Sequence, residues 1–434
     1  MYLAIIGFLL IIALMYVLIA EKMAPPVAFV LFPLIAAVLI GADVAQISEF
    51  VEAGLESILS TAVLFLFSIS FFTLMSEQGL FDPLVDFIIG KVGKNITAIF
   101  IAVVLVATVA HLDGSGASTY LITIPAFKPI MDRLDVRPTA FLGTVVGLMA
   151  AMNIIPWGGP TIRAASVAQV EVFDIYSFIL PAVVFMFLLA LGIAVFHARR
   201  EKARGAGLQG EDLEVTEAAG DETSEMKTSK GLYIYNLILT ITMLVFLFVD
   251  FGFPMHFIFM VAFVLAILGN FRSVKEQGQK IEEFGNNAIV MTMTLFSVGI
   301  FIGVIQESGM VEAMATTIID ILPAFITPHL HWFMALFSVP LMMVLGTDAF
   351  YFALLPIIIG IVGPFEISPQ AVAATFLITG TYGTYISPTV AANYVGIALS
   401  GTTIGEHIRA NLPIMWGASI LTLIVATFLG VIPF

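Results

Sequence analysis

An interrupted apolar segment in the first half of this chain constrains the fold most strongly. Residues 153–163 read Asn-Ile-Ile-Pro-Trp-Gly-Gly-Pro-Thr-Ile-Arg. The apolar runs on either side, 142–152 and 162–170, are each about half of the roughly 20 residues that a helix needs to cross a bilayer. The prolines and glycines therefore predict a helix that breaks at membrane depth, where unpaired backbone is tolerated only inside protein or beside a water-filled cavity.

The residues after this break predict an anion site. Proline is well suited to the first turn of a helix, so Pro160-Thr161 is expected to start a second half-helix. The exposed N–H groups of such a start carry partial positive charge. Arg163 falls in the same turn and is the only basic residue that we place at membrane depth. A broken helix with a charge inside the membrane predicts a substrate site.

The composition is that of a polytopic membrane protein. The chain has 434 residues, of which 60% are hydrophobic and 11% are charged. Residues 1–20 lack a basic start and a small-residue cleavage motif, so we interpret them as a retained span. The chain has no cysteine, which excludes disulfides and thiolate chemistry, and its net charge of -14 argues against nucleic acid as a partner.

Two halves with the same plan are predicted. The first repeat, 1–198, has a re-entrant hairpin at 96–131 and the broken helix at 139–170. A polar linker, 199–230, follows. The second repeat, 231–434, has a hairpin at 331–363 and a broken helix at 370–400, with its break at 380–389. The remaining spans are expected near 2–20, 24–42, 58–76, 176–197, 232–249, 254–270, 287–305 and 411–432.

Short sequences recur at corresponding places in the two halves. Ser76-Glu77-Gln78-Gly79 is echoed by Gln306-Glu307-Ser308-Gly309, and the Pro-Thr that opens the half-helix at 160 recurs at 388. Each half is expected to cross five times, so the halves have opposite orientations. Every Lys and Arg except Arg163 then falls on one side, which predicts a cytoplasmic linker and outward-facing termini in the plasma (inner) membrane. Inverted repeats with broken helices are typical of secondary transporters.

Ionisable residues near the breaks each have two interpretations. Arg163 is either a bidentate clamp for a carboxylate or the structural partner of a buried acid such as Asp113. Asp113 and Asp348, at the two hairpin tips, are candidates for cation or proton coupling and candidate ligands for Na⁺, Mg²⁺ or Ca²⁺, with helix capping as the alternative. His111 is a candidate proton carrier, with a hydrogen-bonded structural role as the alternative.

Uncharged residues around the tips and breaks complete the candidate binding site. Their hydroxyls, amides and backbone groups suit carboxylate oxygens, although hydroxyls also bond helix backbone. No resident cofactor is expected, but Mg²⁺, Ca²⁺, Na⁺ or H⁺ are candidate cotransported ions. The candidate substrate-binding residues are Ser115, Gly116, Ser118, Thr119, Asn153, Gly158, Gly159, Pro160, Thr161, Arg163, Thr347, Ser387, Pro388, Thr389 and Asn393.

Two functions remain open at this point. The favoured one is a secondary active transporter for a small di- or tricarboxylate, coupled to protons or metal cations. The alternative is a cation/proton antiporter, which would use the two aspartates without an organic anion. The motifs His-Glu-x-x-His and Gly-x-Ser-x-Gly are absent from the sequence, so we do not expect an enzyme.

Several segments together resemble the citrate–metal–proton symporter family, which belongs to the ion transporter superfamily and is related to the divalent anion/sodium symporters. They are Gly79-Leu80-Phe81-Asp82-Pro83-Leu84-Val85, Leu112-Asp113-Gly114, the run 152–165 and Asp348-Ala349-Phe350-Tyr351-Phe352. The resemblance runs nearly end to end. It implies a scaffold domain, an elevator-type transport domain that contains both hairpins and both broken helices, and a homodimer in the lipid bilayer.

Three positions differ from the usual pattern of that family. The first tip reads Asp113-Gly114-Ser115-Gly116-Ala117, where the family usually has a second Asp. Thr347 precedes Asp348, where Asn or Pro is usual, and the second break lacks the usual His. Because one carboxylate is missing at the first tip, Asp348 is expected to matter more than Asp113 for dependence on a divalent cation.

Cysteine labelling tests the predicted topology. Because the charge distribution places the linker inside and both termini outside, single cysteines introduced at Gly220 and at Phe434 are expected to react with a membrane-impermeant reagent from opposite sides. Labelling of both from the same side would contradict the inverted-repeat prediction.

Overall fold

The computed structural model describes residues 1–20, 22–89, 95–207, 228–249 and 251–434, and all regular secondary structure within these ranges is helical. In the described part of the chain, seven helices are long and apolar enough to cross a membrane, and four shorter apolar helices accompany them. The expectation of an all-α polytopic membrane protein is therefore confirmed. The central part of the predicted linker, 208–227, lies outside the described residues.

The first half of the chain contains nine α-helices and one 3-10 turn among its described residues. They are α1 (Tyr2–Ile19), α2 (Pro25–Leu39), α3 (Val44–Glu77), α4 (Asp82–Ile89), α5 (Ile96–Ala110), η1 (His111–Asp113), α6 (Gly116–Arg133), α7 (Pro138–Met152), α8 (Gly159–Ala168) and α9 (Val172–Arg204).

The second half follows a similar order. Its elements are α10 (Lys230–Phe248), α11 (Met255–Asn270), α12 (Val274–Glu307), α13 (Met310–Ile321), η2 (Thr327–His329), α14 (Leu330–Ala335), α15 (Ser338–Asp348), η3 (Ala349–Leu354), α16 (Leu355–Val362), η4 (Gly363–Phe365), α17 (Pro369–Thr384), α18 (Ala391–Ser400) and α19 (Ile404–Phe428).

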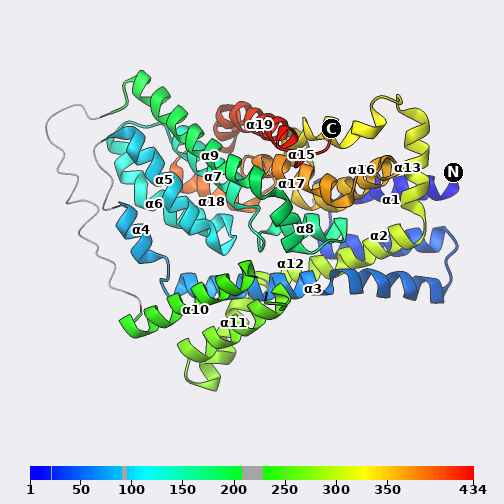
Figure 1. Cartoon of the computed structure of the whole chain (residues 1–434), viewed down its shortest axis with the longest axis horizontal. Coiled ribbons are helices and arrows are strands. Elements are labelled where there is room, and N and C mark those ends of the chain that lie inside the picture. The colour runs from blue at the N-terminus through cyan, green and yellow to red at the C-terminus, as the bar shows by residue number, and fades with distance from the viewer. Residues whose placement is uncertain (21, 90–94, 208–227, 250) are drawn as a thin grey trace.

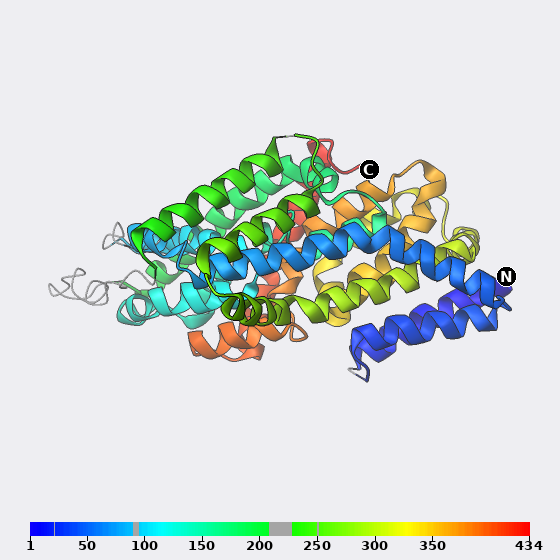
Figure 2. The same ribbon diagram turned by 90° about the horizontal axis from the view of Figure 1, so that it is seen from below.

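The helices form two layers. Helices α2, α3, α10, α11 and α12 lie together along one side of the molecule, and α5–α7, α9 and α15–α19 lie along the other (Figure 1). The view from below shows α3 running across most of the length of the molecule (Figure 2). The C-terminus of α9 and the N-terminus of α10 lie at one end, which we call the linker end, and the N-terminus of the chain lies at the other.

The long helices α3 and α12 pack against each other in antiparallel orientation. Each has 34 residues, which is longer than the apolar spans expected at 58–76 and 287–305. The extra turns are polar and begin at capping boxes, in which Asp43 and Ser273 accept hydrogen bonds from the backbone at the third helical position. A search for apolar residues alone does not detect such turns.

Glycines permit the close approach of α3 and α12. A Cβ on Gly303 would overlap the carbonyl oxygen of Phe50, and a Cβ on Gly54 would overlap that of Gly299. Small residues that let two backbones meet are characteristic of helix packing in membranes. The crossing therefore requires glycine at these positions.

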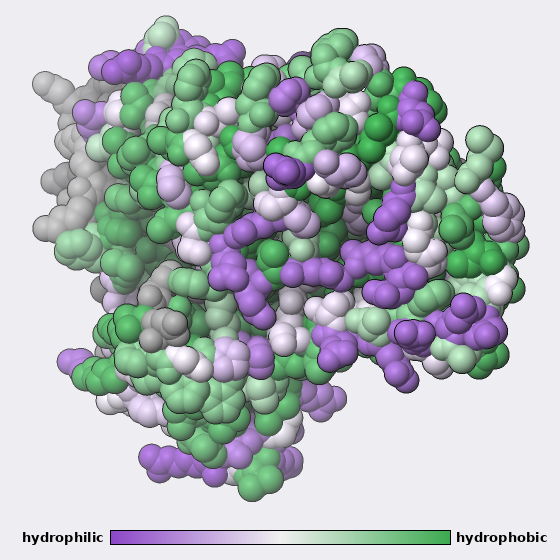
Figure 3. All heavy atoms as spheres, turned by 45° about the vertical axis from the view of Figure 1, so that its right-hand side comes forward, coloured by the Kyte–Doolittle hydropathy of each residue, from purple (hydrophilic) through white to green (hydrophobic). Residues whose placement is uncertain are grey.

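The outer surface is suited to lipid. Large apolar side chains are exposed along one face of α1 at Tyr2, Ile5, Leu9, Ile12 and Tyr16. In the space-filling view, hydrophobic side chains cover much of the visible face, and hydrophilic ones gather in bands between them (Figure 3). Exposed apolar surface of this extent is expected of a protein that a bilayer surrounds.

Two predicted boundaries were wrong. The second break was predicted at 380–389, but α17 continues through Gly380 and Gly383 to Thr384. These glycines serve packing, because a Cβ on Gly380 would stand 2.7 Å from the Phe350 ring. The first hairpin was expected to end at 131, but α6 runs on to Arg133.

A substitution at the α3–α12 crossing tests the packing argument. Gly303→Ala is expected to lower the free energy of unfolding by about 1–3 kcal/mol, because the new methyl group meets backbone that cannot move aside. The thermal midpoint of the purified protein measures the effect. Gly278→Ala is the matched control on the same helix, where the added Cβ meets nothing within 4 Å and stability should not fall. An equal fall in both variants would refute a specific contact.

Candidate functional site

A pocket of about 270 Å³ lies where the two broken helices and the two hairpin tips meet. This volume is near the lower end of the range for small-molecule sites, about 300–1,000 Å³. Residues from segments far apart in the sequence line it. The candidate binding residues among them are Gly116, Asn153, Gly159, Pro160, Arg163 and Thr347.

The first break owes its shape to its prolines and glycines. Helix α7 ends at Met152 and α8 starts at Gly159, with Gly158 as an extended N-cap and Pro160 in the first turn. A Cβ on Gly158 would overlap the carbonyl oxygen of Asn153, so the turn is tight enough to require glycine. The start of α8 thus faces the pocket through Gly159 and Pro160, while Thr161 is fully buried.

Arg163 forms an ion pair with the second hairpin. Its Nε lies 2.9 Å from Oδ1 of Asp348, and the two side chains are 14% and 25% exposed. A Cβ on Gly159 would stand 2.7 Å from Nη1 of Arg163, so this glycine leaves room for the guanidinium. The sequence suggested Asp113 as a structural partner of Arg163, and the structure shows Asp348 in contact with it.

The first hairpin tip is held by its own hydrogen bonds. Oδ1 of Asp113 accepts a bond from the backbone N of Ser115 at 2.8 Å, and Ser115 Oγ accepts one from the N of Ser118 at 3.3 Å. Nδ1 of His111 and Oγ1 of Thr119 lie 2.6 Å apart. Ser115, and not Asp113, is therefore the N-cap of α6, while Asp113 holds the turn before it. The bond of His111 to Thr119 is of the kind expected for a structural histidine.

The first tip also contacts the first break. Nε1 of Trp157 donates a 2.7 Å hydrogen bond to the carbonyl oxygen of Leu112, and a Cβ on Gly114 would stand 3.6 Å from the Trp157 ring. Gly114 has a φ of 74°, which favours glycine. Trp157 therefore packs the tip against the break, and it stacks on Phe72 of α3.

The second tip and second break show the same kind of contact. At the tip, Gly346 has a φ of 72° and interrupts α15 just before Thr347. Ser387 Oγ lies 2.7 Å from Oγ1 of Thr389 and donates to the carbonyl of Met343 at 3.3 Å. Hydroxyls proposed as substrate contacts are thus engaged within the protein.

Two more candidates from the second break also bond within the protein. Asn393 donates through Nδ2 to the carbonyls of Thr384 and Ser387 at 3.1 and 2.7 Å, which ties the start of α18 to the end of α17. The carbonyl of Pro388 accepts a bond from the hydroxyl of Tyr394 at 2.9 Å. Asn393 therefore stabilises the break itself.

Sequence reasoning missed several residues of the pocket. Thr384 and Tyr385 line it from the second break, and the Tyr385 hydroxyl donates to Oδ1 of Asn153 at 3.1 Å. A Cβ on Gly116 would stand 2.5 Å from the Tyr385 ring, so the tip glycine admits this tyrosine. The only sequence signal for Thr384 and Tyr385 was their position within the predicted second break. The remaining missed residues are Phe65, Ile69, Gly114, Val390 and Ala392.

Among the described residues, no group of three or more His, Cys, Asp or Glu side chains is placed to hold a metal ion. Asp113 and Asp348 each belong to a different hairpin tip, and Asp348 already contacts Arg163. A cation at either tip would therefore draw its other ligands from backbone, hydroxyls or the substrate.

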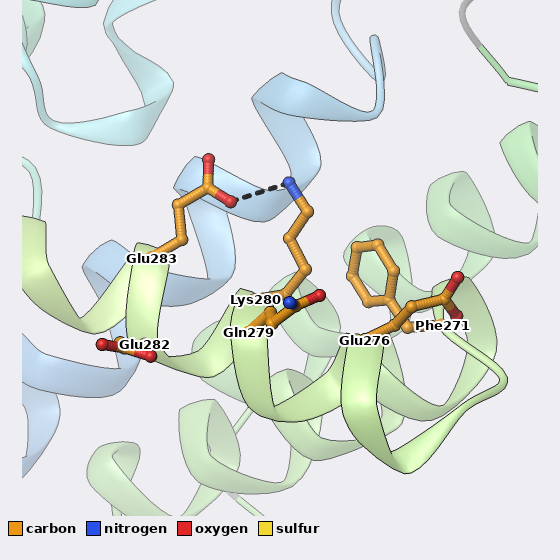
Figure 4. Close-up of a pocket in the computed structure, with 6 residues that line it drawn as sticks. All are labelled: Phe271, Glu276, Gln279, Lys280, Glu282 and Glu283. Atoms are coloured by element: carbon orange, nitrogen blue, oxygen red, sulfur yellow. Dashed lines mark hydrogen bonds and ion pairs between the residues drawn. The ribbon is translucent and has the colours of Figure 1, made fainter.

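A second hollow, of about 530 Å³, lies at the start of α12 (Figure 4). Three glutamates and one lysine line it, and Lys280 bonds Glu283 at 2.9 Å. Its charge is mostly negative and no broken helix reaches it, so it does not suit a carboxylate. The lining residues are Phe271, Glu276, Gln279, Lys280, Glu282 and Glu283.

A family model described as citrate transporter matches residues 14–380. The match covers most of the chain, including both hairpins and the whole first break. The protein belongs to the citrate transporter family. This confirms the resemblance to citrate transporters that the sequence segments indicated. The members of this family are transporters, so the expectation that the chain is not an enzyme is also confirmed.

Three curated proteins of Bacillus subtilis (strain 168) are similar over essentially their whole length. A citrate transporter is 29% identical, and the match covers 100% of this chain and 100% of that protein. An uncharacterized transporter, YraO, is 30% identical, with 99% of this chain and 98% of that protein covered. A Mg(2+)/citrate complex secondary transporter is 27% identical, with 99% of each covered.

Two solved structures of transporters share the fold. The YdaH transporter of Alcanivorax borkumensis has a TM-score of 0.59 at 16% identity, with 89% of this chain and 88% of that chain covered. MtrF of Neisseria gonorrhoeae has a TM-score of 0.59 at 15% identity, with 88% and 81% covered. At these identities the likeness shows the architecture alone.

A double-mutant cycle tests the ion pair between Arg163 and Asp348. Removing either charge alone, by Arg163→Gln or Asp348→Asn, leaves the other charge largely buried, so both single variants should lose stability. The double variant should be less destabilised than their sum, with a coupling energy of about 1–3 kcal/mol in the free energy of unfolding.

The exposed pair Lys128–Asp132 on α6 is the matched control. Its side chains are 29% and 55% exposed, so the corresponding cycle should give a coupling below about 0.5 kcal/mol. Additive effects in the Arg163–Asp348 cycle would show that the pair contributes nothing to the fold.

Proposed function

We propose that this member of the citrate transporter family is a secondary active transporter that carries citrate or a related di- or tricarboxylate, free or as a metal complex. The observation that carries the proposal is the position of Arg163 one turn from the start of α8, in the wall of the pocket. A guanidinium beside a helix start suits a carboxylate. A relative that carries a Mg(2+)/citrate complex makes a metal-bound anion a specific candidate.

Two helix starts reach the same pocket. Gly159 and Pro160 come from the start of α8, and Val390 and Ala392 come from the start of α18. Exposed N–H groups at both starts favour negative charge from two directions. An anion with more than one carboxylate suits such a site better than a monocarboxylate. This arrangement also favours an organic anion over the alternative of a cation/proton antiporter.

The contact between Arg163 and Asp348 supports coupling to a cation. An arriving carboxylate is an alternative partner for Arg163, and in taking that place it frees the carboxylate of Asp348. The freed carboxylate, with oxygens of the bound substrate, provides hard ligands for Mg²⁺ or Ca²⁺, or a site for Na⁺ or a proton. Asp113 is the second candidate for a monovalent ion or proton.

We further propose that the chain consists of two inverted repeats. The antiparallel crossing of α3 and α12 supports this, since these helices hold corresponding positions in the two halves. Helix α8 of the first half packs on η3 and α16 of the second, and α18 packs on α6 of the first. We assign the layer around α3 and α12 to a scaffold and the other to an elevator-type transport domain. The assembly is proposed to be a homodimer in the plasma membrane, with 199–230 cytoplasmic and both termini outside.

Ligand-induced stabilisation of the purified protein tests the proposed substrate. Citrate with Mg²⁺ is expected to raise the thermal midpoint with increasing concentration, because a ligand that binds only the folded state stabilises it. Arg163→Lys keeps the charge but loses the planar fork, so the apparent affinity should fall by about tenfold or more. Arg133→Lys, on an exposed turn of α6, is the control and should match the parent protein.

Unchanged affinity in Arg163→Lys would remove this residue from the binding site. Absence of any shift with citrate, succinate or other di- and tricarboxylates, with and without Mg²⁺, Ca²⁺ and Na⁺, would contradict the proposed substrate class and favour the antiporter.

Asp348→Asn tests the proposed coupling. Uptake of labelled citrate into proteoliposomes, measured across Mg²⁺ concentration and pH, is expected to lose much of its cation dependence in this variant. Asp132→Asn, at an exposed position of α6, is the control and should keep the parent profile. Asp348→Asn with unchanged cation and pH profiles would place the coupling site elsewhere.

A further inference from the structure

One strip of the surface of α9 is apolar and open to the surroundings along most of the helix. Leu180, Val184, Leu188 and Phe196 are between 45% and 59% exposed, and Gly192 is exposed as well. Each is four residues from the next, so consecutive members are neighbours on the helix surface. We call these five residues the α9 strip. It extends for about 24 Å at ~1.5 Å per residue, which is most of the thickness of a bilayer core of roughly 30 Å, and it therefore faces lipid.

The α9 strip leads directly into two arginines. Arg199 and Arg200 follow Phe196 by three and four residues, the spacings at which side chains are neighbours on a helix, and both are exposed. These last turns of α9 lie at the linker end, at the edge of the molecule (Figure 1).

The depth of the two arginines matches that of lipid headgroups. Arg200 stands about 6 Å beyond Phe196 along the helix axis. The headgroup layer is about 5–7 Å deep on each side of the bilayer core. With the α9 strip in the core, the guanidinium groups of Arg199 and Arg200 are therefore within reach of the lipid phosphates.

The charges of Arg199 and Arg200 are not balanced within the protein, although those beside them are. Glu201 is buried and accepts hydrogen bonds from Nε of Arg137 at 2.7 Å and from Nε of Arg204 at 3.1 Å. In the part of the chain that the structure describes, no acidic side chain forms an ion pair with Arg199 or Arg200. Two adjacent positive charges without a counter-charge favour an anionic partner.

We propose that Arg199 and Arg200 bind the phosphate of an anionic phospholipid whose acyl chains lie along the α9 strip. Guanidinium groups form bidentate hydrogen bonds with phosphate, and basic clusters at the end of a membrane span attract anionic lipids. The occupant is a lipid and not a free phosphate ion, because only a lipid covers both the arginines and the apolar strip that leads to them.

The bound lipid lies on the helix that supports the first break. Helix α9 packs against α7 and α8, which are the two halves of the first broken helix, and against α5 of the first hairpin. A lipid on the outer side of α9 therefore holds this group of helices at a fixed depth in the bilayer. The lipid site does not depend on which solute the protein carries.

Native mass spectrometry of the purified full-length protein in detergent tests the proposal with phosphatidylglycerol as the probe. Each basic side chain near an anionic lipid contributes about fivefold to affinity, so Arg199→Gln/Arg200→Gln should weaken phosphatidylglycerol binding by about 25-fold. Phe196→Ala keeps both arginines but removes part of the apolar contact, so it should weaken binding several-fold. Inorganic phosphate added in excess should not displace the lipid.

The matched control is Lys230→Gln/Arg409→Gln, which removes the same charge from two separate exposed positions on α10 and α19. It should keep the parent affinity. Equal weakening in this control would show diffuse attraction by the net charge and overturn the proposal, as would parent affinity in Arg199→Gln/Arg200→Gln. Unchanged affinity in Phe196→Ala, or displacement by inorganic phosphate, would overturn the assignment of the site to a lipid.

Discussion

Backbone groups that leave a helix within a bilayer must find partners inside the protein, and the whole candidate site depends on how this is done at two places. At the first hairpin tip, the carbonyl of Leu112 receives the indole N–H of Trp157, which belongs to the first break. At the second, Asn393 donates to the carbonyls of both Thr384 and Ser387. Because these partners come from neighbouring segments, the breaks and hairpin tips form one unit around the pocket.

The same constraint accounts for the charge of the site. Half-helices that begin inside the molecule bring positive partial charge with them, and Arg163 adds a full charge. Asp348 balances that charge in this structure. In the proposed mechanism, an arriving anion would compete for the same guanidinium, and anion binding would be linked to release of Asp348. A polyanion that enters against an inward-negative potential meets a cost of about 2.3 kcal/mol per charge per 100 mV, and a cation held by the freed carboxylate would offset part of it.

Sequence alone predicted the helical membrane architecture and much of the first break, because Pro156, Gly158 and Pro160 act locally. It misplaced the second break, since Gly380 and Gly383 look like helix breakers but serve close packing. The partnership of Arg163 with Asp348 could not be derived, because 185 residues separate them and Asp113 carries the same charge. Phe65 and Ile69 line the pocket from α3 but resemble any apolar residues of a span.

If a carboxylate binds at the start of α8 in exchange for Asp348, a structure determined with citrate and Mg²⁺ will show it. We expect ligand density in the pocket, with one carboxylate within hydrogen-bonding distance of the Arg163 guanidinium and the Asp348 carboxylate turned towards the cation or towards solvent. Ligand density elsewhere, or an Arg163–Asp348 pair that remains intact beside the bound anion, would contradict it.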